Sequence, residues 1–170
     1  KDMPVFMPHF LRNEISCNVS QCHLCPYVQS SPSIMKTIFK GISFISPKIL
    51  DSESLKEQAA EIKRSFKDFV NLEEDEIIKA IVDAKKKVQS YSNLKESLGN
   101  KFLEEINSDE IYALVLGRSY VLYNEHLNHN FIDVIESYGI KAIPVDYLPV
   151  DKDFISTKYP HIYWNYGQVI

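Results

Sequence analysis

The chain lacks long apolar runs and contains only three cysteines, five glycines and one tryptophan in 170 residues. No apolar run reaches the roughly 18 to 20 residues that cross a bilayer. The N-terminus also lacks the basic, apolar and small-residue series of a signal peptide. We therefore expect a cytoplasmic protein that has no membrane partner.

A surplus of positive charge is also missing. The 19 Lys and Arg residues are outnumbered by 23 Asp and Glu residues, which gives a net charge of −4, and the lysines are scattered. A general nucleic-acid surface needs clustered cations that neutralise phosphates, so we expect no nucleic-acid partner. The hydrophobic share of 45% is instead typical of a folded globular domain.

Several familiar catalytic patterns are absent. The segment after the apolar run ending at Gly117 has one glycine where the phosphate-binding fingerprints need two or three. No HExxH element, Ser, His and Asp order or pair of catalytic carboxylates stands out. The sequence therefore disfavours a nucleotide site and gives no support for hydrolase chemistry.

Apolar and β-branched runs predict strands, and amphipathic stretches predict helices. The strands are expected at 3–10, 41–47, 110–117 and 140–148, and the helices at 32–39, 51–70, 71–108 and 130–139. The helical segment from about 51 to 106 dominates the middle of the chain. Its second part is either one long helix or two helices with a break near Ser92 or Gly99. Strand, helix and strand over 110–148 predict a βαβ crossover.

The alternation of strands and helices predicts an α/β fold. We expect a single Rossmann-like three-layer domain over 1–170 with a mostly parallel sheet. The chain begins "KDMPVFMPHF" and ends "YGQVI", so we expect it to be a fragment of a longer protein. Ligands of such sheets bind beyond the carboxyl ends of the strands, which makes the loops after "VFMP", "ISFIS", "LVLG" and "IPV" the places to inspect.

All three cysteines lie in "SCNVSQCHLCPYVQSSP", residues 16–32. Cys22 and Cys25 form a CxxC pair, and Cys17 lies five residues before Cys22. An odd number of cysteines without a secretion signal disfavours a disulfide framework. Reduced thiols or a metal site are therefore the candidates.

Three interpretations of these cysteines stay open. A local zinc site would use the three thiolates with His23, although structural zinc sites usually combine two ligand pairs. A redox pair would require the CxxC to begin a helix, which the sequence after Pro26 does not predict. The third interpretation is that they are ordinary small residues of a loop.

The segment "LGRSYVLYNEHLNHN" follows the strand predicted at 110–117. Arg118 offers a planar cationic group, and Asn128, His129 and Asn130 place amides and an imidazole before the next helix. This arrangement is suited to an anion or a thiolate-bound cluster. The alternative is a loop in which Asn128 or Asn130 caps the helix.

Taken together, "CPYVQSSP", "LVLGRSYVLYNEHLNHNFIDVIESYGIKAIPVDYLP" and "YPHIYWNYGQVI" resemble one family. This is the family of 2-hydroxyacyl-CoA dehydratases and dehydratase-activator-associated iron–sulfur proteins. The sequence most closely resembles the domain linked to the ATP-dependent activator of (R)-2-hydroxyglutaryl-CoA dehydratase. The resemblance covers residues 3–170, and the block from Gly117 to Pro149 is its most specific part.

The resemblance implies an anaerobic electron-transfer system. In it, an ATPase activator passes a low-potential electron to a partner that holds a [4Fe–4S] cluster through about three cysteines. Cys25 matches one cluster cysteine, whereas Cys17 and Cys22 match no assigned position. Arg118, Tyr120 and Asn128 match the motif and are our candidate cofactor-binding residues.

The resemblance also implies partners: an ATPase activator domain or subunit and, as a further candidate, a dehydratase subunit. The other cluster ligands would lie outside the chain, so the fragment alone should hold no complete cluster and have no activity of its own. Ser119 replaces the usual proline and Asn165 the usual arginine. The alternative functions are a non-enzymatic docking module for the ATPase and a local zinc-binding domain.

Overall fold

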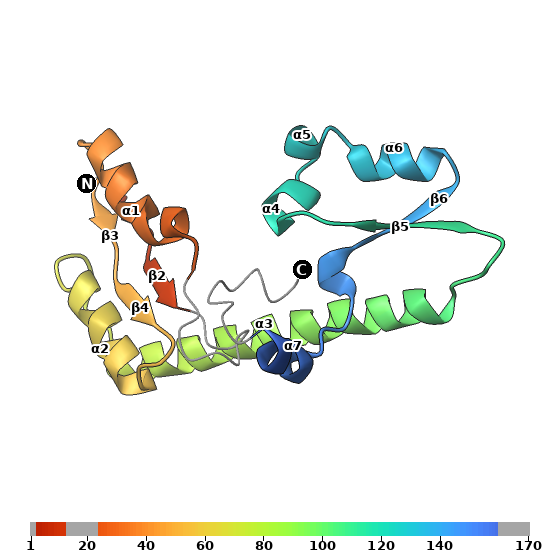
Figure 1. Ribbon diagram of the computed structural model, residues 1–170. Helices are drawn as coiled ribbons and strands as arrows, with labels where there is room; N and C mark the ends of the chain where they lie inside the picture. The colour runs from red at the N-terminus through yellow and green to blue at the C-terminus, as the bar shows by residue number, and fades with distance from the viewer. Residues whose placement is uncertain (1–2, 13–23, 160–170) are drawn as a thin grey trace. The chain divides into compact units, whose positions relative to one another are not determined.

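The computed structural model describes residues 3–12 and 24–159 (Figure 1). These residues form a mixed α/β structure with seven α-helices, one 3-10 helix and six short strands. They divide into two compact units. Within the described residues, unit 1 comprises those up to Lys86 together with 152–159, and unit 2 comprises Lys87–Asp151.

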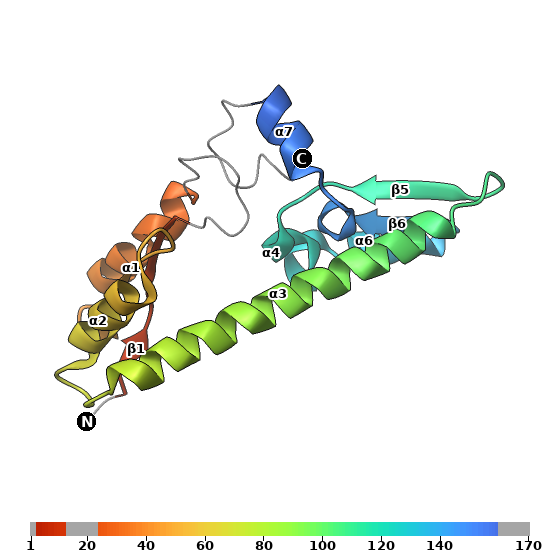
Figure 2. The same cartoon turned by 90° about the horizontal axis from the view of Figure 1, so that it is seen from below.

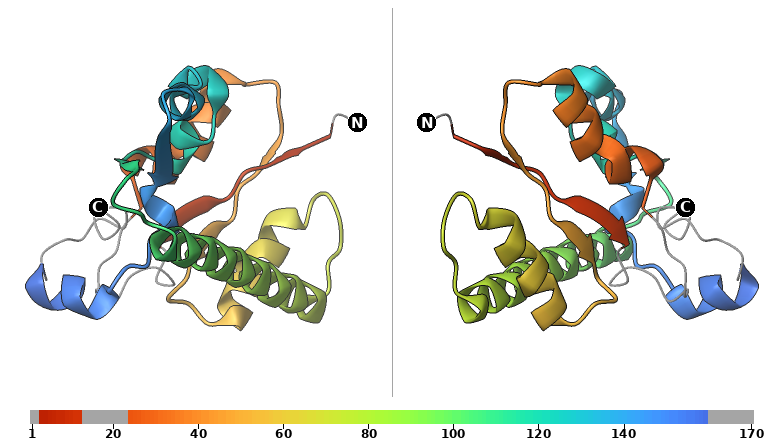
Figure 3. Two further views of the ribbon diagram at one scale, coloured as in Figure 1. Left: turned by 90° about the vertical axis from the view of Figure 1, so that its right-hand side faces the viewer. Right: turned by 90° about the vertical axis from the view of Figure 1, so that its left-hand side faces the viewer.

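The strands of unit 1 form two short parallel pairs that keep one register up to Phe10, after which the register of the second pair shifts. Strand β1 (Val5–Phe6) pairs with β3 (Phe44–Ile45), and β2 (His9–Arg12) pairs with β4 (Lys48–Leu50). Figure 3 shows the red β1 and β2 beside the orange β3 and β4. Pro8 and Pro47 lack the N–H that a continuous ladder would use. The strand predicted at 3–10 is therefore interrupted at Pro8, and Pro47 separates β3, which lies within the strand predicted at 41–47, from β4.

Backbone hydrogen bonds nevertheless continue across this interruption. The N–H of Met7 donates to the carbonyl of Ile45 at 2.9 Å, and the N–H of His9 donates to the carbonyl of Pro47 at 2.8 Å. Pro47 and Ile45 are buried, so the gap between the strand pairs is filled by side chains. The two pairs thus behave as one interrupted parallel ribbon.

Helix α2 (Leu55–Phe66) packs against β4 and begins with a capping box. The Ser54 hydroxyl accepts from the Glu57 N–H at 3.3 Å, and the Glu57 carboxylate accepts from the Ser54 N–H at 2.8 Å. The first residues of the helix expected at 51–70, including Asp51 and Ser52, therefore lie outside α2. Asp51 instead accepts from the Lys85 ammonium at 2.7 Å and ties the start of α2 to α3.

Helix α3 (Glu74–Glu104) is a single helix of 31 residues, as Figure 2 shows. This resolves the choice that the sequence left open, because no break occurs at Ser92 or Gly99. Its three acidic residues at the N-terminus suit the positive end of the helix dipole. Its first part belongs to unit 1 and its second part to unit 2.

Unit 2 contains the predicted βαβ crossover. Strands β5 (Ile111–Val115) and β6 (Ile140–Pro144) pair in parallel along their whole length. The connection between them consists of three short helices: α4 (Ser119–Leu122), α5 (Glu125–Asn128) and α6 (Phe131–Ser137). The 3-10 helix η1 (Val145–Tyr147) follows β6. In Figure 1, β5 and β6 lie between α6 and the second half of α3.

The interior of unit 2 lies around the carboxyl end of this strand pair. The side chains of Val115, Leu122, Ile143 and Val145 are buried there. Helix α6 packs against β6, and Phe102 of α3 meets the ring of Tyr112 edge-on at a centroid distance of 5.6 Å. The crossover, strand pair and α3 therefore share one apolar interior.

The fold class is thus confirmed at the level of a mixed α/β structure with parallel strand pairs. The Rossmann-like three-layer arrangement with a mostly parallel sheet stays a prediction, as does the single domain over 1–170. Helix α7 (Lys152–Lys158) completes the described elements. Across residues 3–12 and 24–159, no helix has both the length and the apolar character of a membrane span.

Gly99 provides a test of the packing in unit 2. A methyl group at this position of α3 would overlap the backbone carbonyl of Tyr147. Alanine normally favours a helix by about 1 kcal/mol over glycine, but forcing atoms into packed space costs about 1 to 3 kcal/mol. We therefore expect Gly99→Ala to lower the free energy of unfolding, measured by urea denaturation.

Gly41→Ala is the matched control, because a methyl group there meets no atom within 4 Å. It should leave stability unchanged or raise it by up to about 1 kcal/mol through the unfolded state. Equal or greater stability of Gly99→Ala relative to wild type would contradict the close approach of α3 and η1.

Candidate functional site

Cys25 lies immediately before helix α1 (Pro26–Ile38) as its N-cap residue. Its carbonyl accepts from the N–H groups of Val28 at 2.9 Å and Gln29 at 3.1 Å, which closes the first turn. The residue is half-buried and its thiol is free. The expectation that the chain does not continue as a helix after Pro26 is therefore wrong.

Two local features explain why α1 begins so early. Pro26 occupies the first turn, where a missing N–H costs nothing. Pro32 lies inside the helix and cannot donate to the carbonyl of Val28. The Ser31 hydroxyl donates to that carbonyl instead, at 3.0 Å. The serine thus compensates for the hydrogen bond that Pro32 cannot make.

Two side chains attach the first turn of α1 to its surroundings. The ring of His9 on β2 contacts the carbonyl of Gln29 through Nδ1 at 3.0 Å. Since a carbonyl only accepts, this nitrogen carries the hydrogen in the bonded tautomer. The amide of Gln29 donates to the carbonyl of Leu24 at 2.6 Å. The backbone on both sides of Cys25 is therefore held in place.

Cys17, Cys22 and His23 lie outside the described residues, so the zinc and redox interpretations of the CxxC pair stay predictions. In the part of the chain that the structure describes, no group of three or more His, Cys, Asp or Glu residues could hold a metal ion.

The second candidate region lies at the carboxyl end of β5. Arg118 is the N-cap residue of α4, and Tyr120 lies on α4 with 66% of its surface exposed. Asn128 ends α5, where its amide donates to the carbonyl of Leu122 at 2.7 Å and its side-chain oxygen accepts from the Asn130 N–H at 2.8 Å. The bonds of Asn128 thus hold its own segment together.

The sequence favoured Asn128 or Asn130 as the helix cap in this segment, but a different asparagine caps a helix here. Asn124 caps α5, because its side chain accepts from the N–H groups of His126 and Leu127, both at 3.1 Å. Asn130 precedes α6 without a side-chain cap and, like His129, has a left-handed backbone. Asparagine tolerates this conformation better than most residues. The αL pair turns the chain between α5 and α6.

The same edge of unit 2 carries a polar network that sequence reasoning missed. The Lys95 ammonium donates to one oxygen of Asp146 at 2.8 Å, and the Tyr123 hydroxyl donates to the other at 2.5 Å. Lys95 comes from α3, Tyr123 follows α4, and Asp146 follows β6. Both side chains of the ion pair are largely buried, at 19% and 12% exposed.

Aromatic rings surround this network. The Lys95 nitrogen lies 5.3 Å from the ring centroid of Tyr91 and 6.0 Å from that of Tyr147, within the range of cation–π attraction. Burial, and then the hydrogen bond to Asp146, raise the pKa of Tyr123 far above its usual value of 10.0. Tyr123 therefore stays a protonated donor, and the network locks the carboxyl edge of the β5–β6 pair.

Only part of this network could be found from the sequence. Asp146 lies two residues after strand β6, at the edge where ligands of parallel strands bind. Lys95 lies 51 residues earlier, on a helix with many other lysines. Lys95, rather than another lysine of α3, pairs with Asp146 because of the way in which α3 packs against the strand pair.

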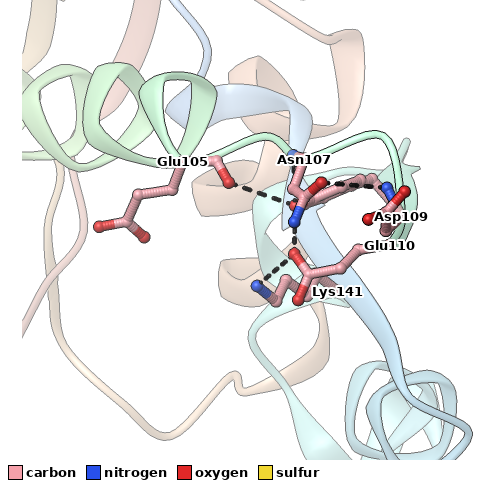
Figure 4. Close-up of polar contacts among 6 residues, drawn as sticks. Glu105, Asn107, Asp109, Glu110 and Lys141 are labelled. Carbon is pink, nitrogen blue, oxygen red and sulfur yellow. Dashed lines mark hydrogen bonds and ion pairs between the residues drawn. The ribbon is translucent and has the colours of Figure 1, made fainter.

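A second network lies at the opposite, amino end of the same strands (Figure 4). The carboxylate of Glu110 accepts from the Lys141 ammonium at 2.7 Å and from the Tyr112 hydroxyl at 2.5 Å. The Tyr112 oxygen in turn accepts from the Asn107 N–H at 2.9 Å. Hydrogen bonding by Lys141, then by Tyr112, lowers the pKa of Glu110. This exposed network is structural, since ligands of parallel strands bind at the other end.

The chain matches, over residues 3–148, the family described as CoA enzyme activase uncharacterised domain (DUF2229). Because this span covers most of the chain, the chain belongs to that family. We found no match among curated proteins or among solved structures. The relation to CoA-enzyme activators and dehydratases that the sequence indicated is thus confirmed.

Tyr123→Phe tests the network of Lys95, Asp146 and Tyr123. It removes the hydrogen bond that the hydroxyl of the half-exposed Tyr123 donates to Asp146, and such a bond contributes about 0.5 to 1.5 kcal/mol. We expect a loss of that size in the free energy of unfolding. Tyr120→Phe, on the exposed side of α4, should change stability by less than about 0.5 kcal/mol. Equal effects of the two variants would refute the network.

Lys141→Gln tests the amino-end network through pH. Because the folded-state pKa of Glu110 is lowered below 4.5, its contribution is present above that value and is lost as pH falls through the lowered pKa. The stability difference between wild type and Lys141→Gln should thus be full near about pH 6 and shrink below about pH 4. Urea denaturation across pH measures it.

Lys86→Gln is the control, because Lys86 pairs with Asp83 at 4.0 Å on an exposed face of α3. Exposed pairs of this kind contribute little, so its effect should be small at every pH. A Lys141→Gln difference that does not vary with pH would contradict the assignment of Glu110.

Proposed function

We propose that this chain is a domain of an iron–sulfur electron-transfer protein of the (R)-2-hydroxyglutaryl-CoA dehydratase activator type. Cys25 would contribute one ligand to a [4Fe–4S] cluster in the intact protein. The observation that carries the proposal is the position of Cys25, held at the start of a helix in a member of a CoA enzyme activase family. Such a cluster supplies one-electron transfer at low potential.

The donor set fits a shared cluster. Among the described residues Cys25 is one free, half-buried thiol, whereas a cubane cluster takes about three or four thiolates. The remaining ligands would come from other parts of the intact protein, with Cys22 and Cys17 as further candidates. The hydrogen bonds that hold the Cys25 backbone support a fixed ligand, because ligand orientation depends on such surrounding contacts.

Arg118 and Tyr120 are proposed as contacts to the cofactor or its anionic surroundings, and Asn128 as the residue that shapes their loop. Arg118 precedes α4 and Tyr120 is exposed, so both lie at the strand edge where ligands of α/β sheets bind. The bonds of Asn128 to Leu122 and Asn130 support a positioning role. Asn128 would therefore act through its bonds to the loop backbone, whereas Arg118 and Tyr120 would contact the ligand directly.

The partners proposed for the intact protein are an ATPase activator domain or subunit and a dehydratase subunit. The family description, CoA enzyme activase, supports a CoA-dependent enzyme as the final target. The parent protein would then take part in an ATP-dependent system that activates a dehydratase, in the cytoplasm. The domain alone would hold no complete cluster and have no activity.

A non-enzymatic docking module is the second candidate function. It is favoured by the single cysteine of the described residues, because one thiol cannot assemble a cluster. A local zinc site through Cys17, Cys22 and Cys25 is the third. Metal analysis of the isolated chain distinguishes this third candidate from the other two, since a zinc site would give one zinc per chain.

Anaerobic reconstitution of the intact protein with iron and sulfide tests the leading proposal. Removal of one of about three or four thiolate ligands should leave the cluster incomplete or lost. We expect Cys25→Ala to bind less than about half of the iron and sulfide of wild type. Ser33→Ala is the control, because it changes an exposed residue of the same helix that carries no thiol, and it should bind as much as wild type.

The same variants separate the docking alternative. A docking module predicts that Cys25→Ala still binds the purified ATPase activator and keeps the iron and sulfide content of wild type. Equal cluster content in Cys25→Ala and wild type would overturn the ligand assignment, whatever the binding result.

A further inference from the structure

Nine consecutive residues in the middle of helix α3 are exposed. They span 86–94, whereas Ile77 before them and Gly99 after them are buried. Nine residues make about two and a half helical turns, so every side of the helix is open over this stretch. The boundary between units 1 and 2 falls at its start, between Lys86 and Lys87. We name residues 86–94 the α3 connecting stretch.

Ion pairs hold α3 immediately outside the α3 connecting stretch. Lys85 pairs with Asp51 at 2.7 Å in unit 1, and Lys95 pairs with Asp146 at 2.8 Å in unit 2. Both carboxylates are largely buried, at 13% and 12% exposed, so the pairs are better shielded from solvent than surface pairs. The helix is therefore attached to a different unit on each side of the stretch.

The sequence of the α3 connecting stretch, KKVQSYSNL, is weak in helix propensity. Ser90, Ser92 and Asn93 favour a helix less than alanine does, because their side chains compete for backbone hydrogen bonds. The Gln89 amide donates to the Asn93 side chain at 2.8 Å, a contact within the helix itself. Most helical stability in proteins comes from tertiary packing. Exposure and weak propensity together make this stretch the part of α3 that costs least to open.

We propose that the α3 connecting stretch is a hinge, which opens locally and lets units 1 and 2 change their orientation. A hinge is a short segment whose backbone dihedrals absorb such a change while the elements on both sides stay intact. Unit 1 contains Cys25 and unit 2 contains Arg118, so the hinge lies along the chain between the two candidate regions. The proposal is independent of the cluster assignment, because it depends on burial, ion pairs and helix propensity.

Hydrogen–deuterium exchange of the complete 170-residue chain, read by peptide mass spectrometry, tests the opening. We expect the amides of the α3 connecting stretch to exchange about tenfold or more faster than those of 76–84 and 96–104, because packed elements exchange through larger openings. The double variant Ser90→Ala, Ser92→Ala should slow exchange in the stretch by about fivefold, since alanine is the stronger helix former at both positions.

Ser97→Ala is the matched control. Ser97 is an exposed serine of the same helix, but it lies between Lys95 and Gly99, where α3 is held to unit 2. This variant should leave exchange in the α3 connecting stretch unchanged. Circular dichroism confirms that the variants are folded, which substitutions at exposed positions permit.

Reorientation of the units is measured separately from opening of the helix. Spin labels on p-acetylphenylalanine in place of Tyr27 and Tyr138, which are 79% and 80% exposed, report the distance between unit 1 and unit 2 by double electron–electron resonance. We expect a broad distance distribution in the otherwise unchanged chain. The double alanine variant should narrow this distribution, and Ser97→Ala should not.

Three results would overturn the hinge: exchange in the α3 connecting stretch as slow as in 76–84 and 96–104, equal slowing by Ser97→Ala and the double alanine variant, or distance distributions of equal width in the double alanine variant and the unchanged chain. None of these measurements depends on iron or on Cys25, so the hinge and the cluster assignment fail independently.

Discussion

Parallel pairing of short strands is the constraint on which the rest of this structure depends. Every strand pair of the described residues is parallel, and parallel neighbours cannot be joined by a tight turn. The chain must therefore leave the carboxyl end of one strand, form helices and return. Both units meet this requirement: α1 lies between β2 and β4, and α4 to α6 lie between β5 and β6.

This constraint gives the two candidate regions equivalent positions. Cys25 is the residue before the helix that follows β2, and Arg118 is the residue before the helix that follows β5. Each therefore lies where a crossover begins, beyond the end of a strand. In unit 2 the ion pair of Lys95 with Asp146, completed by Tyr123, fixes this edge from three separate elements. Fixed backbone at such an edge is what a bound cofactor requires.

The sequence predicted most elements correctly because their patterns are local. The apolar run of β5, the helix α6 and the strand β6 follow one another in order, and their βαβ crossover is confirmed. Helix α1 was expected only from residue 32, because the segment after Pro26 does not predict a helix; the structure begins it at Pro26, where the Ser31 hydroxyl takes over the hydrogen bond that Pro32 cannot make. Gly99 suggested a break in α3, yet it lies there because Tyr147 approaches the helix closely. The Lys95 to Asp146 pair depends on packing over long separation, which no local pattern encodes.

The most direct test of the central claim, that Cys25 is a cluster ligand, is differential alkylation of the intact protein under anaerobic conditions. Iodoacetamide labelling followed by peptide mass spectrometry reports each thiol separately, because a sulfur bound to iron does not react as a free thiolate does. The account predicts that Cys25 is protected in the iron-loaded protein and labelled after iron is removed with a chelator. Equal labelling of Cys25 in the loaded and chelated protein would contradict it.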